Sequence, residues 1–136
     1  MSDAFHRECP ARMVLDHVTS RWGVLVLTAM RERPLRFYEL RAKIEGISEK
    51  MLSQTLRTLV RDGFVLRTVT PSAPPQVSYA LTDLGQGITE PLQALFDWIR
   101  NHANAIVAAQ AAHERQGGRA GSDITPVYGP PPTVNP

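Results

Sequence analysis

Four polar side chains between residues 50 and 57 have the types and spacing of a surface that contacts nucleic acid. They lie in the segment 46–65, GISEKMLSQTLRTLVRDGFV, whose leucines recur at helical spacing and would face a core. The opposite side of that helix would present Lys50, Ser53, Gln54 and Arg57. Hydroxyl and amide groups can meet base edges, whereas Lys and Arg can meet phosphates or a guanine edge. Taken alone, the same pattern also fits an ordinary solvated helix face.

Cys9 is another residue whose side chain could be chemically reactive, and it is the one cysteine in the chain. An internal disulfide is therefore excluded, and an oxidative bridge would need a thiol from another chain or a small molecule. Cys9 precedes Pro10 at the expected start of a helix, where unpaired amides and the helix dipole favour a negative charge. Two interpretations stay open: a thiol that senses oxidants or electrophiles, and an inert cysteine packed in an interface.

The sequence does not point to an enzyme. The histidines at positions 6, 17, 102 and 113 lack the spacing of metal ligands. We find no Gly-rich phosphate loop, no pair of acidic residues suited to acid–base catalysis, and no base close to Ser20. We therefore expect neither catalysis nor a metal or cofactor.

The length of the chain fits one small domain, and its first half holds more Lys and Arg than Asp and Glu. The chain has 136 residues, of which 43% are hydrophobic. Residues 1–70 hold 12 Lys or Arg against 8 Asp or Glu, while residues 71–115 hold 2 against 4. Arg outnumbers Lys by 13 to 2, and its planar fork suits phosphate and guanine. A mixed solvated surface would explain the same balance.

No membrane segment or secretory signal is visible in the sequence. There is no uncharged apolar run of 18 or more residues, and residues 1–10 lack an apolar h-region. We expect a cytoplasmic protein without membrane contact.

Periodicity predicts the elements that would position the candidate side chains. Helices are expected at 10–18, 21–31, 37–44, 48–62 and 83–112, the last kinked or restarted at Pro91. Residues 35–36 would form a short extended step. Residues 65–81 would form a β-hairpin whose tip is stiffened by the PSAPP run.

A helix, a short turn, a second helix and then a hairpin is the order of a winged helix-turn-helix. The expected fold is therefore mainly α with a small β-hairpin wing. Its recognition helix would enter the major groove, and the hairpin would touch the neighbouring backbone. In this arrangement the candidate DNA contacts are Arg36, Ser48, Lys50, Ser53, Gln54, Arg57, Ser72 and Gln76.

Two long runs carry a family resemblance. CPARMVLDHVTSRWGVLVLTAM and RPLRFYELRAKIEGISEKMLSQTLRTLVRDGFVLRTVTPSAPPQVSYALTDLG together resemble the HxlR-type winged helix-turn-helix transcriptional regulators over residues 9–100. The matching landmarks are Cys9-Pro10, Arg21-Trp22, Phe37, Glu39-Leu40, Gly46-Ile47-Ser48, Leu52, Leu56, Leu59, Gly63, Pro74-Pro75, Val77, Tyr79 and Leu81-Thr82. Many members have Gly-Gly where this chain has Thr19-Ser20, which would change the turn between the first two helices.

The resemblance implies a homodimeric bacterial DNA-binding regulator that dimerises through its first and last helices. It also implies that residues 48–62 are the recognition helix and that some relatives sense oxidants at the position of Cys9. The residues themselves support a dimer, because the long last helix carries an apolar seam that so small a domain would leave exposed. The expected interface residues are Leu84, Ile88, Leu92, Leu95, Ile99, His102 and Ile106.

The expected function is that of a homodimer that binds an inverted-repeat operator in double-stranded DNA, with repression favoured. An oxidant or electrophile acting at Cys9 is one candidate signal. One alternative is a regulator gated by a small molecule between the dimer helices, with Trp22, Phe96 and Trp98 lining the pocket. The other is a winged helix that serves only as an interaction module.

Three segments make up the expected domain organisation. Residues 1–8 would be a flexible arm, residues 9–115 the winged helix-turn-helix domain with its dimerisation helix, and residues 116–136 a disordered tail. The tail segment is rich in Gly and Pro and lacks periodic apolar positions.

Overall fold

The computed structural model describes residues 5–119. Residues 1–4 of the expected arm and residues 120–136 of the expected tail lie outside this range. The chain falls into two compact units, residues 1–96 and residues 97–136, which are described separately.

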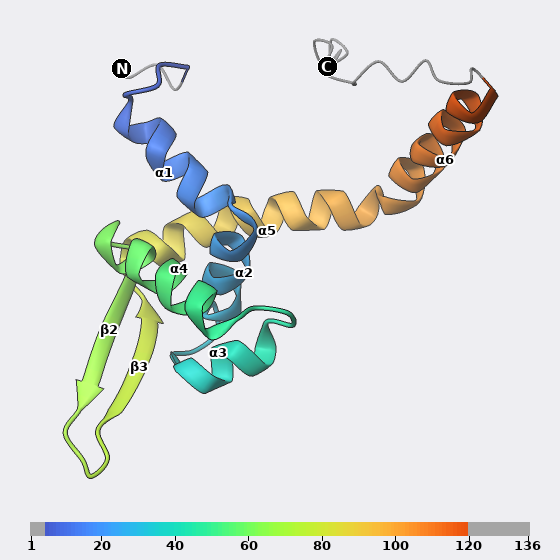
Figure 1. Ribbon diagram of the computed structural model, residues 1–136. Helices are drawn as coiled ribbons and strands as arrows, with labels where there is room; N and C mark the ends of the chain where they lie inside the picture. The colour runs from blue at the N-terminus through green and yellow to red at the C-terminus, as the bar shows by residue number, and fades with distance from the viewer. Residues whose placement is uncertain (1–4, 120–136) are drawn as a thin grey trace. The chain divides into compact units, whose positions relative to one another are not determined.

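Helices dominate the first unit (Figure 1). They are α1 (Pro10–Thr19), α2 (Arg21–Ala29), α3 (Phe37–Lys43), α4 (Glu49–Arg61) and the first part of α5 (Asp83–Asn101). Local signals explain their ends: Pro10 opens α1, and the hydroxyls of Ser20 and Ser48 cap α2 and α4. The predicted helices of this unit are confirmed in type and order.

The hairpin belongs to a three-stranded antiparallel sheet. Its strands are β1 (Leu35–Arg36), β2 (Val65–Thr70) and β3 (Gln76–Leu81), in the order β1-β3-β2. The predicted hairpin is confirmed, with Val65 opposite Leu81 and Thr70 opposite Gln76. The expected extended step at 35–36 is confirmed, and as a strand it also pairs with β3 at Ser78 and Tyr79.

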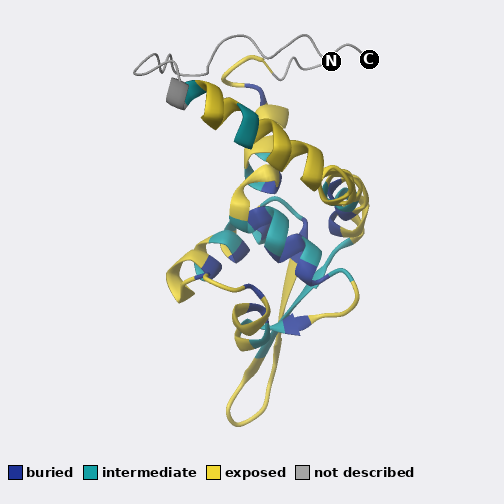
Figure 2. Cartoon of the chain, turned by 90° about the vertical axis from the view of Figure 1, so that its right-hand side faces the viewer, coloured by how far each residue is buried: buried dark blue, intermediate teal, exposed yellow. Residues whose placement is uncertain are grey.

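One hydrophobic core holds α2, α3, α4 and the base of the sheet together. Its fully buried members come from α2 and its C-cap, from α3 and from α4, and include Leu27, Met30, Leu40, Leu52, Leu56 and Leu59. The buried residues line the inner sides of the helices, while the hairpin tip is exposed along its length (Figure 2). The core therefore fixes α4 and the root of the wing, and the wing tip reaches into solvent.

The single helix expected at 83–112 is wrong. The chain instead forms α5, which ends at Asn101, and α6 (Ala103–Arg119). Pro91 lies inside α5 without ending it, and the interruption falls at His102. There the His102 amide donates to both the Trp98 and Ile99 carbonyls, which marks a local departure from regular helix. Residues 116–119, expected in the tail, are the end of α6.

Across the described part of the chain, no helix is both long enough and apolar enough to cross a bilayer.

Candidate nucleic-acid interface

Helix α4 is the central element of the candidate interface. Its inward leucines, at positions 52, 56 and 59, are all at most 2% exposed, so the opposite side must face outward. The Ser48 hydroxyl accepts the Met51 amide at 3.1 Å and satisfies one free donor of the first turn. Gly63, at φ +85°, supplies the left-handed residue that ends the helix. The outward face is therefore set by both burial and caps.

The predicted contacts of α4 divide between two flanks of the helix. Ser53 and Arg57 line a cleft of about 220 Å³ beside the hairpin, whereas Gln54 lines a cavity of about 170 Å³ beside α1. Lys50 is exposed and lines neither. Ser53 is half-buried, so it faces outward less than its position in the sequence suggested. The polar side of α4 thus presents different groups to the wing and to α1.

Two residues of the wing-side cleft were missed by the sequence interpretation. Arg67 on β2 and Tyr79 on β3 line it together with Ser53 and Arg57. Alternation along the hairpin could have revealed them, because Arg67 and Tyr79 are cross-strand partners and share one face of the sheet. Arg67 is exposed and Tyr79 is half-buried.

Two other predicted DNA contacts bind each other. The Arg36 guanidinium, at the end of β1, donates to the Gln76 side-chain oxygen at the start of β3. The structure therefore brings Arg36 and Gln76 together at the sheet, near the wing. Ser72 is at the exposed wing tip, where its hydroxyl donates to the Pro74 carbonyl at 2.6 Å.

Ion pairs occupy some cations near α4 and leave others free. Arg41 binds Glu49 at 2.7 Å, and Arg33 binds Glu39 at 3.2 Å. By contrast, Lys50, Arg57, Arg61 and Arg67 have neither a hydrogen-bond nor an ion-pair partner for their side chains among residues 5–119. These four positively charged side chains are therefore not neutralised by a direct ion pair within residues 5–119.

Glu39 serves the start of α3 rather than the interface. The Arg36 backbone N–H donates to Glu39 Oε1 at 3.0 Å, and the Arg33 guanidinium donates to Oε2. These two bonds, the backbone one above all, hold the pKa of the Glu39 carboxyl below its usual value.

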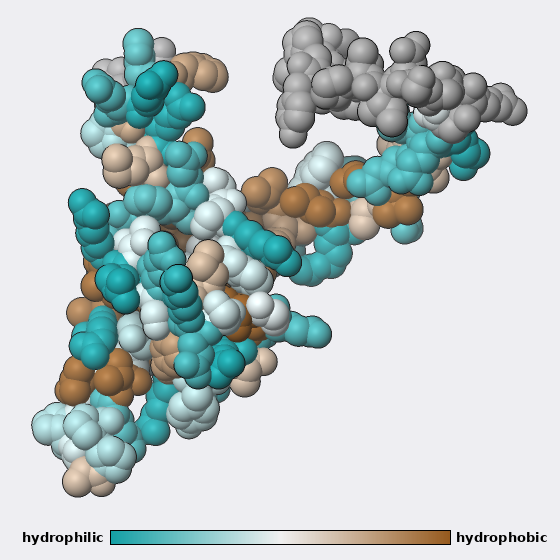
Figure 3. Space-filling view, viewed as in Figure 1, coloured by the Kyte–Doolittle hydropathy of each residue, from teal (hydrophilic) through white to brown (hydrophobic). Residues whose placement is uncertain are grey.

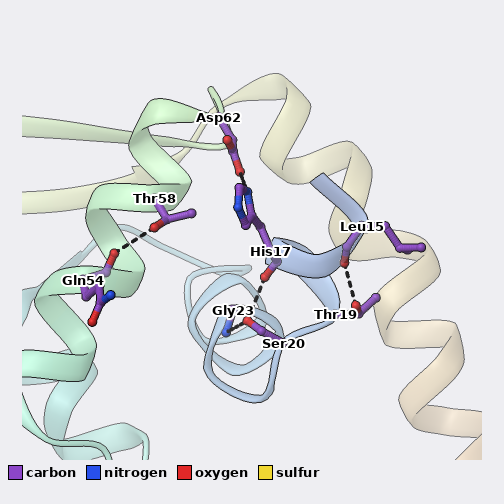
Figure 4. Close-up of polar contacts among 8 residues, drawn as sticks. All are labelled: Leu15, His17, Thr19, Ser20, Gly23, Gln54, Thr58 and Asp62. Carbon is purple, nitrogen blue, oxygen red and sulfur yellow. Dashed lines mark hydrogen bonds and ion pairs between the residues drawn. The ribbon is translucent and has the colours of Figure 1, made fainter. Parts of the chain in front are cut away.

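The corner between α1 and α2 anchors α4 from the other side (Figure 4). Ser20 Oγ donates to the His17 carbonyl at 2.8 Å and accepts the Gly23 amide at 3.1 Å. The His17 ring Nδ1 lies 2.6 Å from Asp62 Oδ2, at the C-terminal cap of α4. The contact between His17 and Asp62 therefore joins α1 to the end of α4.

The predicted dimer residues fall into two groups. Leu84 and Leu95 are 65% and 51% exposed in the first unit, and Ile99, His102 and Ile106 are exposed in the second. The expectation fails for Leu92, which is 5% exposed and belongs to the core of its own chain. Ile88 is half-buried and packs against the same core. The prediction missed exposed apolar residues at Met13 and Leu15 on α1, and at Val107 on α6.

Of the aromatic residues proposed for a ligand pocket between dimer helices, Trp22 and Phe96 belong to the first unit and Trp98 belongs to the second. Trp22 packs against the core of the first unit, with the Arg21 guanidinium 4.6 Å from its ring centre. Trp98, in the second unit, stacks on His102 with 4.1 Å between ring centres. A cavity of about 710 Å³ is lined by other residues, chiefly of α2 and the end of α3.

Cys9 lies at the N-cap of α1 and is 7% exposed. Its carbonyl accepts the Arg12 amide at 3.0 Å, so the backbone around the thiol is tied into the first turn. Within residues 5–119 no group of three or more His, Cys, Asp or Glu side chains is placed to hold a metal ion.

The hairpin also exposes apolar side chains. Leu66 and Val69 on β2 are both exposed, and hydrophobic surface lies over this strand in the space-filling view (Figure 3). The wing is therefore a mixed surface, with hydroxyl and guanidinium groups beside methyl groups.

Comparison with known proteins decides the family, because the model of the HxlR-like helix-turn-helix family matches residues 17–107. The chain belongs to this family. It is 51% identical over 106 residues to the HTH-type transcriptional regulator YtfH of Escherichia coli, covering 78% of this chain and 84% of YtfH. The fold matches the YtfH structure from Salmonella typhimurium with a TM-score of 0.77 at 46% identity, over 82% and 99% of the two chains.

A more distant structural match is the redox regulator HypR in its reduced form. It matches with a TM-score of 0.68 at 28% identity, over 73% of this chain and 98% of HypR. Together these relatives confirm the expected winged helix-turn-helix fold and the class of DNA-binding transcriptional regulators rather than enzymes.

Proposed function

We propose that the protein is a homodimeric, sequence-specific repressor that lays α4 into the major groove of an inverted-repeat operator. The observation that carries the proposal is the outward side of α4. It exposes Lys50 and Gln54 in a region where the side chains of Lys50, Arg57, Arg61 and Arg67 form no ion pair or hydrogen bond within residues 5–119. Lys can meet phosphates or guanine, and Gln can bind adenine through two hydrogen bonds. The wing would lie against the neighbouring backbone.

Exposed apolar side chains support dimerisation. Met13 and Leu15 on α1, and Leu84 and Leu95 on α5, are all at least half exposed. A small protein rarely leaves so many large apolar side chains in water, and a second copy would cover them. A dimer also places two copies of α4 about one helical turn of DNA apart, which doubles a modest reading surface.

Repression follows from binding alone. A bound dimer obstructs RNA polymerase where its operator overlaps a promoter, so this mode requires no surface other than the DNA interface. We therefore favour repression over activation.

The test compares Gln54→Ala with Gln86→Ala in gel-shift titrations. The probes are the DNA upstream of the protein's own gene and a random duplex of equal length. Gln54→Ala should weaken binding to the upstream DNA by about 1–3 kcal/mol and bring it closer to random DNA. Gln86, exposed on α5, is the matched control and should leave both affinities unchanged.

Two results would contradict the proposal. If the unaltered protein binds neither duplex, the winged helix is an interaction module instead. If Gln54→Ala and Lys50→Ala together leave discrimination between the duplexes unchanged, α4 does not read the operator.

Regulation through Cys9 is a second candidate, favoured by the likeness to HypR, whose structures include a reduced and an oxidised form. We propose that Cys9 forms a disulfide with a small thiol or with Cys9 of a second copy. An oxidant such as diamide would take up the two electrons and two protons released. Because Cys9 is only 7% exposed, the groups that cover it must first move.

Mass spectrometry and gel shifts after diamide treatment test this second candidate. A mixed disulfide or a linked dimer, together with loss of DNA binding that Cys9→Ser prevents, supports it. An unmodified thiol, or equal loss of binding in Cys9→Ser, excludes it.

A further inference from the structure

The cleft between α4 and the hairpin has the make-up of an anion site. Its volume is about 220 Å³, far more than the ~30 Å³ that one water molecule occupies in the liquid. One wall is a single stripe of α4, formed by Ser53, Arg57 and Val60 at helical spacing. The facing wall is the cross-strand pair of Arg67 and Tyr79.

Charge in this cleft is unbalanced. Arg57 and Arg67 both line it, and no carboxylate is among its lining residues. Neither guanidinium has a partner within residues 5–119, unlike Arg36, which binds Gln76, and Arg41, which binds Glu49. Both side chains carry a positive charge, so an anion bound in the cleft would be attracted by both.

The remaining lining residues suit an oxyanion. The lining residues Ser53 and Tyr79 each carry a hydroxyl donor, and Arg57 and Arg67 each carry five N–H donors. Leu56, 2% exposed, forms an apolar floor that strengthens electrostatic attraction above it. Guanidinium and hydroxyl groups around one concave space are the donors that bind phosphate best.

We propose that this cleft holds one phosphate of the DNA backbone, gripped by Arg57 from the recognition helix and by Arg67 from the wing. The inference rests on the proposed function. It assigns Arg57 to the backbone rather than to a base edge, and it leaves sequence discrimination to Lys50 and Gln54. It also explains how the wing contributes to binding, because Arg67 binds the same phosphate from the hairpin side of the cleft.

Salt-dependent binding to a random-sequence duplex of about 30 base pairs tests the proposal. The slope of log affinity against log salt counts the phosphates neutralised, at about 0.9 per phosphate. The variants are Arg57→Ala, Arg67→Ala, the double variant, and Arg61→Ala. Arg61 is the matched control, since it loses one exposed, unpaired charge of the same helix and does not line the cleft.

The double variant should lower the slope by about 0.9, the value for one phosphate. It should weaken binding to upstream and random DNA by the same factor, because a phosphate contact carries no sequence information. Arg61→Ala should change the slope by clearly less. Circular dichroism should show the same thermal unfolding for every variant, since both arginines of the cleft are exposed.

Distinct outcomes overturn the inference. A slope change in the double variant no larger than that of Arg61→Ala removes the cleft as a phosphate site, although the unaltered protein still binds DNA. A change near 1.8 shows two separate phosphates instead. Tight calorimetric binding of inorganic phosphate in the absence of DNA would assign the cleft to a free anion. If the unaltered protein binds no duplex, the proposed function fails as well.

Discussion

His17 in the last turn of α1 contacts Asp62 at the C-terminal cap of α4, with 2.6 Å between Nδ1 and Oδ2. The Asp62 side chain is 11% exposed, and the His17 side chain is 29% exposed. This contact joins an element with exposed apolar side chains to the element proposed to read DNA. A change in the position of α1 would therefore be felt at α4.

Replacing Asp62 by Ala should lower the free energy of unfolding by about 1 kcal/mol, at the low end of the cost of an unmade bond, because His17 remains partly hydrated. DNA binding should weaken severalfold because α4 loses an anchor. Denaturant titration and gel shifts measure the two effects. A double-mutant cycle with His17→Ala isolates the contact, and additive losses would show that the two side chains are not coupled.

Gly23→Ala should destabilise the protein by about 1–3 kcal/mol. A Cβ at this position would lie 2.1 Å from the His17 carbonyl oxygen and 2.7 Å from Ser20 Oγ, so the corner between α1 and α2 would have to open. Gly87→Ala is the control, since nothing lies within 4 Å of its Cβ and the residue is inside α5. It should stabilise the helix by about 0.5–1 kcal/mol. Thermal unfolding of both variants checks the pair, and equal effects would contradict the geometry of the corner.

Leu95→Lys should convert the proposed dimer to a monomer. Leu95 is 51% exposed in the single chain, so the lysine would cost the fold little, whereas burying its charge in an interface without a partner is costly. Leu66→Lys, on the exposed face of β2, is the control and should remain dimeric. Sedimentation equilibrium distinguishes the two states. A dimeric Leu95→Lys protein would place the interface elsewhere.

Stability should depend on the Glu39 carboxylate in acid. Its pKa is lowered in the folded chain by the Arg36 N–H and then by Arg33, so ionised Glu39 favours the folded state. This contribution is fully present above the ordinary pKa of a glutamate and is lost as the pH falls through the lowered one. Denaturant titration of the unaltered protein and Glu39→Gln should therefore show a difference at neutral pH that shrinks in acid. A difference independent of pH would contradict the assignment.

The elements and their order could be predicted from the sequence because their signals are local. Leu52, Leu56 and Leu59 at helical spacing, Ser48 before them and Gly63 after them defined α4 without tertiary information. Alternation around the PSAPP run defined the hairpin in the same way. A run of family landmarks then pointed to the HxlR-like family, which the comparisons confirmed.

Only the tertiary structure decided which side chains meet. Leu92 and Leu95 belong to the same periodic apolar series. Leu92 is nevertheless buried in the core, because α5 packs that side of the helix against its own unit. Arg57 and Arg67, ten residues apart in sequence, line the same cleft because β2 folds back beside α4. Arg36 and Gln76, forty residues apart, form a hydrogen bond because β1 pairs with β3 in the sheet. Periodicity states which way a residue faces on its own element. What lies opposite depends on long-range packing, which no local pattern encodes.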